Sequence, residues 1–388
     1  MDILGVLNFA ISVALGILIL VILVVVHELG HAIAARRNGV VVEEFGIGFP
    51  PRAWSKKLKN GVLFTLNWLP LGGFVKLQGE NDSATKQGDY GAANLWVKAK
   101  ILLAGVGINW LVAALIFTVL AITGMPKVID NQFTVAGDTQ EVRDPVTLTG
   151  VAGGSPAAQA GLKKGDEILR FNGEPIPSPE ALLSFTNRNK GKQAEIIYKR
   201  DGRESIARPV LRDSQKPGEG PLGVTTAQQT VYHSTWSAPI VGVATTVQFT
   251  ATTLNGLGEM VGNLVKGLAL QLNIFDEKAR TEGSQALQKA GDDVAGPVGI
   301  LGVIFPAARD AGLTSLLLLT GIVSLTLAVM NALPIPALDG GRLFVTLLFR
   351  ALKKPLTKER EESIHGTGFL VLMLLVLIIT ISDVGRLF

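Results

Sequence analysis

The chain has 388 residues, of which 48% are hydrophobic and only 18% are charged, whereas about 25% are charged in a typical soluble domain. This balance argues against a soluble protein and favours a lipid bilayer, and the length predicts more than one folded unit. The net charge of +4 comes from dispersed Lys and Arg residues, so we expect no nucleic-acid partner, and the absence of cysteine excludes disulfides and thiolate metal ligands.

Four segments are long and apolar enough to cross a membrane. The first has no charged residue from Ile3 to Val26, and 24 residues of helix extend about 36 Å, more than the roughly 30 Å of hydrocarbon. It lacks the basic start and the cleavage site of a signal peptide, so we expect a retained helix. The expected spans are about 3–33, 101–123, 313–333 and 367–382.

Basic residues near the ends of the spans predict the orientation of the chain. They cluster between the first and second spans and again between the third and fourth, which predicts that both connections are cytoplasmic. Both chain ends and the segment from about 125 to 311 then lie outside the cytoplasm. The basic residues are Arg36, Arg37, Arg52, Lys56, Lys57, Lys59, Lys98 and Lys100 in the first connection, and Arg342, Arg350, Lys353, Lys354, Lys358 and Arg360 in the second.

The end of the first span carries a candidate metal motif, His27-Glu28-Leu29-Gly30-His31. Two imidazoles at i and i+4 lie on one helix face and can reach a single ion, and Glu28 can take a proton from a water that attacks a carbonyl. Two surface histidines on a helix are the plainer interpretation in a soluble protein. At a membrane span, however, such groups are costly to desolvate and are functional by default, which favours one catalytic zinc ion.

A third protein ligand is needed for an open zinc site, and Asp339 is the best candidate. It follows the third span in the segment Asn-Ala-Leu-Pro-Ile-Pro-Ala-Leu-Asp-Gly-Gly-Arg, residues 331–342. Pro334 and Pro336 interrupt the helix, which directs a carboxylate inward at a depth similar to that of the two histidines. The alternative is that Asp339 only caps the helix that begins after it.

The two other histidines are weaker candidates for the third ligand. His233 lies in the outer segment, on the side of the membrane opposite to the connection that follows His31. His365 lies in a charged stretch that is typical of a solvated helix face. We expect neither of them to bind the metal.

Residues 61–80 are expected to form two extended runs. Val62, Phe64, Leu66 and Trp68 alternate with the residues between them, and a second run follows from Gly72-Gly73-Phe74 to Gly79. An enzyme that hydrolyses a peptide bond within a membrane helix would first have to unwind that helix, and an exposed strand edge can pair with the unwound backbone. This predicts substrate contacts at Gly72, Gly73 and Phe74, and the alternative is an ordinary cytoplasmic hairpin.

The outer segment is expected to hold a small α+β domain and a helix at the membrane surface. The domain contains two turn signals, at Asn172-Gly173 and Asp201-Gly202. A mixed polar and apolar stretch at about 235–275 predicts an amphipathic helix, and residues 276–293 predict a loop or an exposed helix. We expect residues 1–124 and 312–388 to lie in the membrane, residues 146–225 to form the domain and residues 235–311 to form the surface segment.

These motifs together resemble the bacterial site-2 proteases. His-Glu-Leu-Gly-His lies in the first span and Asn-Ala-Leu-Pro-Ile-Pro-Ala-Leu-Asp-Gly-Gly follows the third, while residues 150–173 are similar to the signature of bacterial PDZ domains. The resemblance implies that His27, His31 and Asp339 bind one zinc ion and that Glu28 is the general base. It also implies a mainly α-helical membrane protein with four transmembrane helices and an inserted extracytoplasmic PDZ domain.

Further expectations follow from the same resemblance. Asn331 and Pro334 are expected to handle substrate, residues 61–80 to form a cytoplasmic membrane-reentrant β-hairpin, and the Gly296-Pro-Val-Gly-Ile300 segment to be a family feature. The implied location is the bacterial cytoplasmic membrane, with the active site near its cytoplasmic side. The implied partners are the lipid bilayer and single-pass membrane substrates such as anti-sigma factors and remnant signal peptides. The chain resembles the branch with a single PDZ domain, which either captures a peptide, filters substrates by size or is a plug without a ligand.

Two other classes of function remain as alternatives. The first is a non-catalytic membrane scaffold or chaperone, in which the metal is structural. Such a site should be closed by a fourth protein ligand, whereas the chain offers mainly one carboxylate beside the histidine pair. The second is a zinc transporter, which would need a second set of polar residues along a crossing to pass the ion onward. Hydrolysis is the favoured function.

Overall fold

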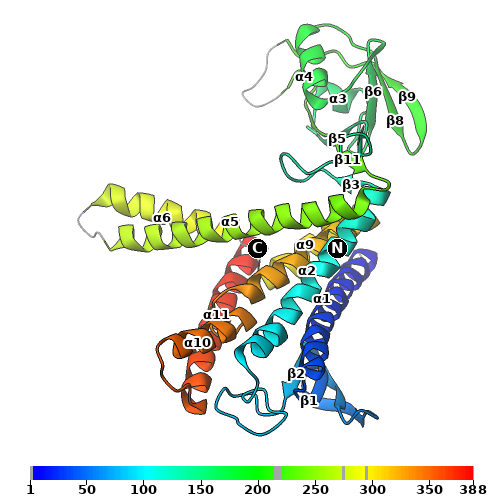
Figure 1. The fold of residues 1–388 in the computed structure, drawn as a ribbon. Helices are drawn as coiled ribbons and strands as arrows, with labels where there is room; N and C mark the ends of the chain where they lie inside the picture. Colours follow the sequence, from blue (N-terminus) through cyan, green and yellow to red (C-terminus); the bar gives the residue numbers. More distant parts are fainter. Residues whose placement is uncertain (1–2, 214–219, 273–275, 293–295, 388) are drawn as a thin grey trace. The chain divides into compact units, whose positions relative to one another are not determined.

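The computed structural model describes residues 3–213, 220–272, 276–292 and 296–387 (Figure 1). The chain divides into two units that are each compact. The first combines Met1–Leu120 with Ala238–Phe388 and is called the membrane unit below, and the second is Ala121–Ser237, called the inserted unit.

Four helices in the described portion of the membrane unit are long and apolar enough to cross a membrane. Each corresponds to one of the expected spans, although α9 ends at Ala332, one residue early. The last begins earlier than expected because the charged stretch before residue 367 is helical too. Large apolar side chains cover the outside of these helices, which would be unfavourable in water and is favourable in lipid. The helices are α1 (Ile3–Arg37), α2 (Leu95–Thr123), α9 (Leu313–Ala332) and α11 (Lys358–Leu387).

Small residues allow the helices of this bundle to approach closely. A Cβ atom added to Gly30 of α1 would lie 2.7 Å from the backbone oxygen of Ala104 in α2, and one added to Gly321 of α9 would lie 2.6 Å from the ring of Phe117. Close packing through small residues replaces the hydrophobic effect as the cause of helix association in a membrane. In Figure 1 the start of α1 and the end of α11 lie at one end of the bundle, and a small sheet lies at the other.

That sheet consists of two long, bent strands, β1 (Val42–Lys57) and β2 (Leu63–Leu77). The two runs expected at residues 61–80 both belong to β2, but the expected direct pairing between them is wrong. Phe45 pairs with Phe64 on one side and with Val75 on the other, so the first half of β1 lies between the two halves of β2. The second half of β1 pairs with residues 63–67. Residues 73–77 therefore form one edge of the sheet.

Two further helices of the membrane unit form a hairpin, α5 (Ala238–Gln271) and α6 (Glu277–Asp292). They run side by side (Figure 1), because Gly267 of α5 leaves room for Leu287 of α6. The segment after α6 is a short helical run whose start is held by Asp383, which accepts hydrogen bonds from the N–H groups of Gly296 and Gly299. This run comprises α7 (Pro297–Gly299), η1 (Ile300–Ile304) and α8 (Phe305–Asp310).

The inserted unit contains a sheet in the order β10-β5-β6-β8-β9, with β7 paired to β6. A buried apolar core that includes Ile168, Phe171 and Ile196 lies beneath α3 (Pro156–Gln159) and α4 (Pro179–Arg188). Both predicted turns are present, with positive φ at all four of their residues. The strands of this sheet are β5 (Val146–Val151), β6 (Glu167–Phe171), β7 (Glu174–Pro175), β8 (Ile196–Arg200), β9 (Arg203–Ala207) and β10 (Val224–Ala227).

A second sheet of the inserted unit has the order β3-β11-β4. Its strands are β3 (Met125–Pro126), β4 (Gln140–Arg143) and β11 (Thr230–His233). The connection before β4 is held by Asp138, whose carboxylate accepts hydrogen bonds from the side chains and the backbone N–H groups of Thr235 and Ser237. These bonds hold the connection before β4 against the last residues of the inserted unit.

Candidate metal centre

The histidine pair lies in the C-terminal half of α1, where the helix faces α2. Because the two residues are one turn apart, both imidazoles project from one face of the helix, and their Nε2 atoms are 3.1 Å apart. Only 6% of His27 and 8% of His31 is exposed, although the segment that carries them has an exposed apolar surface elsewhere. Two buried imidazoles with facing nitrogens are unfavourable unless something lies between or beside them.

Asp339 reaches this pair from the opposite end of the sequence. It is the first residue of α10 (Asp339–Ala351), and it follows the break that Pro334 and Pro336 cause after α9. Its Oδ2 atom lies 3.0 Å from His27 Nε2 and 3.2 Å from His31 Nε2. The residue at the N-cap position of α10 is Leu338, so Asp339 is the first residue of the helix and does not occupy the capping position.

The three ligand atoms are suited to hold a metal ion. They lie within 4.8 Å of one another, and the three separations between 3.0 and 3.2 Å are close to the edge of about 3.3 Å expected for a tetrahedral zinc site. Within the described residues this group contains two histidines and one carboxylate, which leaves a coordination position for water.

Hydrogen bonds behind the imidazoles orient them toward this point. His31 Nδ1 donates to the backbone oxygen of Ile101 at 2.7 Å, which leaves a lone pair on its Nε2 atom. The amide of Asn109 lies 3.4 Å from His27 Nδ1 and is fully buried. With the amide rotated by half a turn, Asn109 Oδ1, which is buried without a partner, would accept a hydrogen bond from the N–H group at His27 Nδ1. Asn109 was not predicted as a site residue from the sequence, although a lone Asn within an apolar span is a recognisable signal.

Gly105 of α2 makes room for the two imidazoles. A Cβ atom at this position would lie 2.5 Å from His31 Nε2 and 2.7 Å from His27 Nε2. A glycine is therefore required where α2 passes the two candidate metal ligands. It was not predicted from the sequence, because glycines that allow helix packing and glycines that make room for a site look alike in a single sequence.

Glu28 faces the edge of the β1–β2 sheet. The Cγ atom of Glu28 is 3.7 Å from the position that a Cβ of Gly73 would occupy, and the backbone of Val75 hydrogen-bonds to its carboxylate. A backbone that paired with the edge formed by residues 73–77 would therefore pass beside this carboxylate.

The other residues expected to contact substrate lie in β2 and at or just after the end of α9. Gly72 has a φ of +103° and lies against the ring of Phe49, while Phe74 packs over Gly46. Asn331 is in the last turn of α9, and Pro334 is exposed in the loop that follows. Gly73 lies beside Glu28, because a Cβ atom built on it would be 3.7 Å from the Cγ of this predicted catalytic residue.

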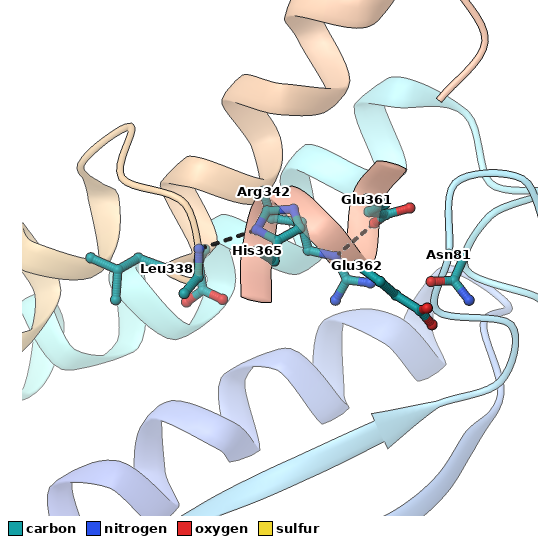
Figure 2. Close-up of a pocket in the computed structure, with 8 residues that line it drawn as sticks. Asn81, Leu338, Arg342, Glu361, Glu362 and His365 are labelled. Atoms are coloured by element: carbon teal, nitrogen blue, oxygen red, sulfur yellow. Dashed lines mark hydrogen bonds and ion pairs between the residues drawn. The ribbon is translucent and has the colours of Figure 1, made fainter. Parts of the chain in front are cut away.

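A polar pocket opens beside Asp339 (Figure 2). Arg342, on α10, lies 3.5 Å from Glu361 of α11 and also covers the ring of Tyr90 at 4.9 Å. Burial raises the pKa of the Tyr90 hydroxyl well above its usual value, so this ring stays neutral beside the guanidinium. The pocket is lined by Asn81, Ala337, Leu338, Asp339, Arg342, Glu361, Glu362 and His365.

Neither of the remaining histidines joins the metal ligands. His233 is in β11 of the inserted unit, where it pairs with Gln140. The expectation that His365 lies on a solvated face is wrong: it is half-buried, and its Nδ1 atom accepts a hydrogen bond of 3.1 Å from the N–H of Ala337. With Nδ1 used in this way, the neutral ring carries its proton on Nε2, which leaves no lone pair for a metal.

Two histidines and one aspartate that could hold a metal ion, within a bundle of helices long and apolar enough to cross a membrane, are the arrangement expected of an intramembrane metalloprotease. The sequence model of Peptidase family M50 matches residues 15–375. The chain therefore belongs to this family, the site-2 proteases.

Relatives of known name agree with this assignment. Zinc metalloprotease RasP of Bacillus licheniformis is 28% identical over 455 residues, which cover 96% of this chain and 98% of that protein. Regulator of sigma-W protease RasP of Bacillus subtilis is 26% identical over 465 residues, which cover 98% and 100%. A solved PDZ domain from Listeria monocytogenes is 27% identical, covers 22% of this chain and 88% of that domain, and has a TM-score of 0.20. The chain is a membrane metalloprotease of the site-2 type.

Proposed function

We propose that this protease cleaves transmembrane segments of single-pass membrane proteins, with one zinc ion held by His27, His31 and Asp339. The observation that carries the proposal is the meeting of the three ligand atoms, within 4.8 Å, from two helices that are far apart in the sequence. Zinc in such a site supplies Lewis-acid polarisation of a carbonyl and activation of a water.

The roles of the side chains follow from their positions. Glu28 lies on the same helix as the two histidines and acts as the general base that takes the proton of the attacking water. The same carboxyl group then gives that proton to the amine that leaves when the peptide bond breaks. The burial of His27 and His31 excludes bulk water from the ligands and strengthens the interactions within the site.

The substrate must be extended where it is cut, because a helix hides its peptide bonds. We propose that the edge formed by residues 73–77 pairs with the unwound segment of the substrate, with Gly72, Gly73 and Phe74 in contact with it. The position of Gly73 against Glu28 supports this role. Asn331 and Pro334 are proposed to hold the substrate on the side of α9.

The substrates and the topology belong to the same proposal. The name of the Bacillus subtilis relative, a regulator of sigma-W protease, supports anti-sigma factors as substrates, and remnant signal peptides are the second class proposed. In a bacterial cytoplasmic membrane the metal centre lies near the cytoplasmic side. Both chain ends and the inserted unit, with residues 146–225 as a PDZ domain that limits access of substrates, lie outside the cytoplasm.

The Glu28→Gln variant tests the assignment of the base. Purified in detergent with a single-pass substrate, it should bind one equivalent of zinc and give no product, because the amide keeps the shape of the side chain and removes the base. Wild-type protein supplies the positive control, and His27→Ala should lose both zinc and product. Continued cleavage by Glu28→Gln would refute the assignment of Glu28 as the base.

A further inference from the structure

The loop that carries Asp339 has a backbone conformation that it would not adopt alone. Ala337, two residues before the ligand, has a φ of +83°, in the region that residues with a side chain rarely occupy. Such a conformation persists only where surrounding contacts hold it, and these sites cluster where function needs a fixed geometry. The contacts that hold Ala337 therefore also determine where Asp339 lies.

Those contacts come from one face of α11. His365 Nδ1 accepts the N–H of Ala337 at 3.1 Å, a bond that is drawn in Figure 2. One turn later, Gly368 lies so close to Pro336 that an added Cβ atom would be 2.5 Å from both the Cβ and the oxygen of this proline. One turn earlier, Glu361 lies 3.5 Å from Arg342, which follows Asp339 in α10. Positions i, i+4 and i+7 share one face of a helix.

These three contacts hold the chain on both sides of Asp339. His365 and Gly368 contact residues before the ligand, and Glu361 contacts a residue after it. The contact between Glu361 and Arg342 is itself supported. Glu361 accepts a hydrogen bond of 2.8 Å from the N–H of Asp82, and only 3% of Glu361 is exposed. Neither nitrogen of His365 is free to bind an ion, so its place beside the metal centre needs a different explanation.

We propose that His365 and Gly368 are positioning residues for the third metal ligand. Through Ala337 and Pro336, they hold the loop in the conformation that directs Asp339 at His27 and His31. The affinity of the site for zinc therefore depends on the position of α11, the last membrane helix. The inference rests on the proposed zinc site and adds to it a dependence on a helix that contributes no ligand.

A pair of glycines on α11 provides a matched test. A Cβ atom at Gly368 would collide with Pro336, whereas one at Gly366 would have open space around it. Both variants, Gly368→Ala and Gly366→Ala, are made in the full chain and purified in detergent, and their zinc affinity is measured by competition with a chelator. Gly368→Ala should bind zinc about 10- to 100-fold more weakly, as is typical for changes behind the ligands, and Gly366→Ala should match wild type. Equal affinities in both variants would overturn the proposal.

Substitution of His365 tests the hydrogen bond itself. His365→Ala removes the acceptor, whereas His365→Asn places a carbonyl oxygen near the position of Nδ1. With cobalt(II) in place of zinc, the absorption bands report the coordination geometry. We expect altered bands and weaker binding in His365→Ala and recovery of both in His365→Asn. An unchanged His365→Ala spectrum, or equal losses in the two variants, would refute the role of this bond.

The same measurements separate this inference from the function on which it rests. If wild-type protein binds no zinc at His27, His31 and Asp339, the proposed function fails. If wild type binds zinc and cleaves substrate while Gly368→Ala and His365→Ala behave as wild type does, only the positioning role fails. Circular dichroism of each variant shows whether the helices are intact.

Discussion

At the scale of single residues, the metal centre depends on side chains that are small as much as on those that bind. Gly105 lies so close to the two imidazoles that no side chain fits between its backbone and the rings. Gly340 and Gly341, immediately after Asp339, pack in the same way against the backbone that precedes them. The glycine on α2 thus leaves space for the imidazoles, and the two glycines on α10 allow close packing of the loop that carries Asp339.

This leads to a first prediction. Gly105→Ala should weaken zinc binding by on the order of 10-fold or more and reduce cleavage in parallel, because the new methyl group displaces both imidazoles. Gly107→Ala is the matched control on the same helix, since an added Cβ there meets nothing within 4 Å. Zinc content after dialysis against a chelator measures the effect. Similar zinc retention in both variants would show that the imidazoles tolerate the methyl group.

The sequence predicted the ligands better than the residues that support them. The His-Glu-x-x-His spacing and the proline break before Asp339 each pointed to candidate ligands through known geometry, and the candidate ligand atoms lie within 4.8 Å of one another. Asn109, Gly105 and His365 carry no such spacing. His365 in particular lies among charged residues, so its partner, a backbone N–H of a strained loop, is evident only in three dimensions.

At the scale of secondary-structure elements, a buried ion pair fixes the loop between β2 and α2. Lys98 has no exposed surface, its ammonium group pairs with Asp82, and it lies 5.4 Å from the ring of Tyr90. The backbone of Asp82 also donates to Glu361 of α11. One carboxylate residue therefore connects this loop to two membrane helices.

Removal of one partner of this pair should be costly. Asp82→Asn leaves the charge of Lys98 buried without its carboxylate, and we expect a loss of about 3–5 kcal/mol in the free energy of unfolding. The double variant Asp82→Asn with Lys98→Met should recover most of that loss, because no buried charge remains. Thermal unfolding in detergent, followed by circular dichroism, compares the three proteins. A double variant less stable than Asp82→Asn would contradict the expectation.

The Asp138 hydrogen bonds predict a pH dependence in the inserted unit. The hydroxyl of Ser237, followed by that of Thr235, lowers the pKa of the Asp138 carboxyl to about 2 from its usual value near 3.8. Because the pKa is lower in the folded state, the stabilisation is complete above about pH 4 and is lost as the pH falls toward 2. Urea unfolding of residues 121–237, followed by Trp236 fluorescence, should show this loss in wild type. Asp138→Asn should flatten that step, and an identical step in both would assign it to another group.

The elements themselves differ in how well the sequence revealed them. The four spans and the two turns of the inserted unit follow from long apolar runs and from Asn-Gly and Asp-Gly pairs. The strand β1 was not predicted, because Gly46, Gly48 and the Pro50-Pro51 pair hide its alternation. As β1 supplies the segment between the two halves of β2, the pairing of the sheet could not be derived either.

At the scale of the whole molecule, the absence of cysteine makes the proposed topology directly testable. Lys59→Cys lies in the exposed connection between β1 and β2, and Glu204→Cys lies on exposed β9 of the inserted unit. In spheroplasts, a membrane-impermeant maleimide should label Glu204→Cys directly and Lys59→Cys only after permeabilisation. The reason is that the two positions are proposed to lie on opposite sides of the membrane. The reverse pattern would invert the topology, and equal labelling would place both sites on one side.

The long separation between the metal ligands has a consequence for biosynthesis. His27 and Asp339 are 312 positions apart, and ribosomes add about 5–20 residues each second, so the histidine pair waits on the order of half a minute for its carboxylate. Throughout that interval the nascent polypeptide lacks one of the three proposed ligands. Hydrolysis at the proposed zinc site therefore cannot begin until translation of the chain is almost finished.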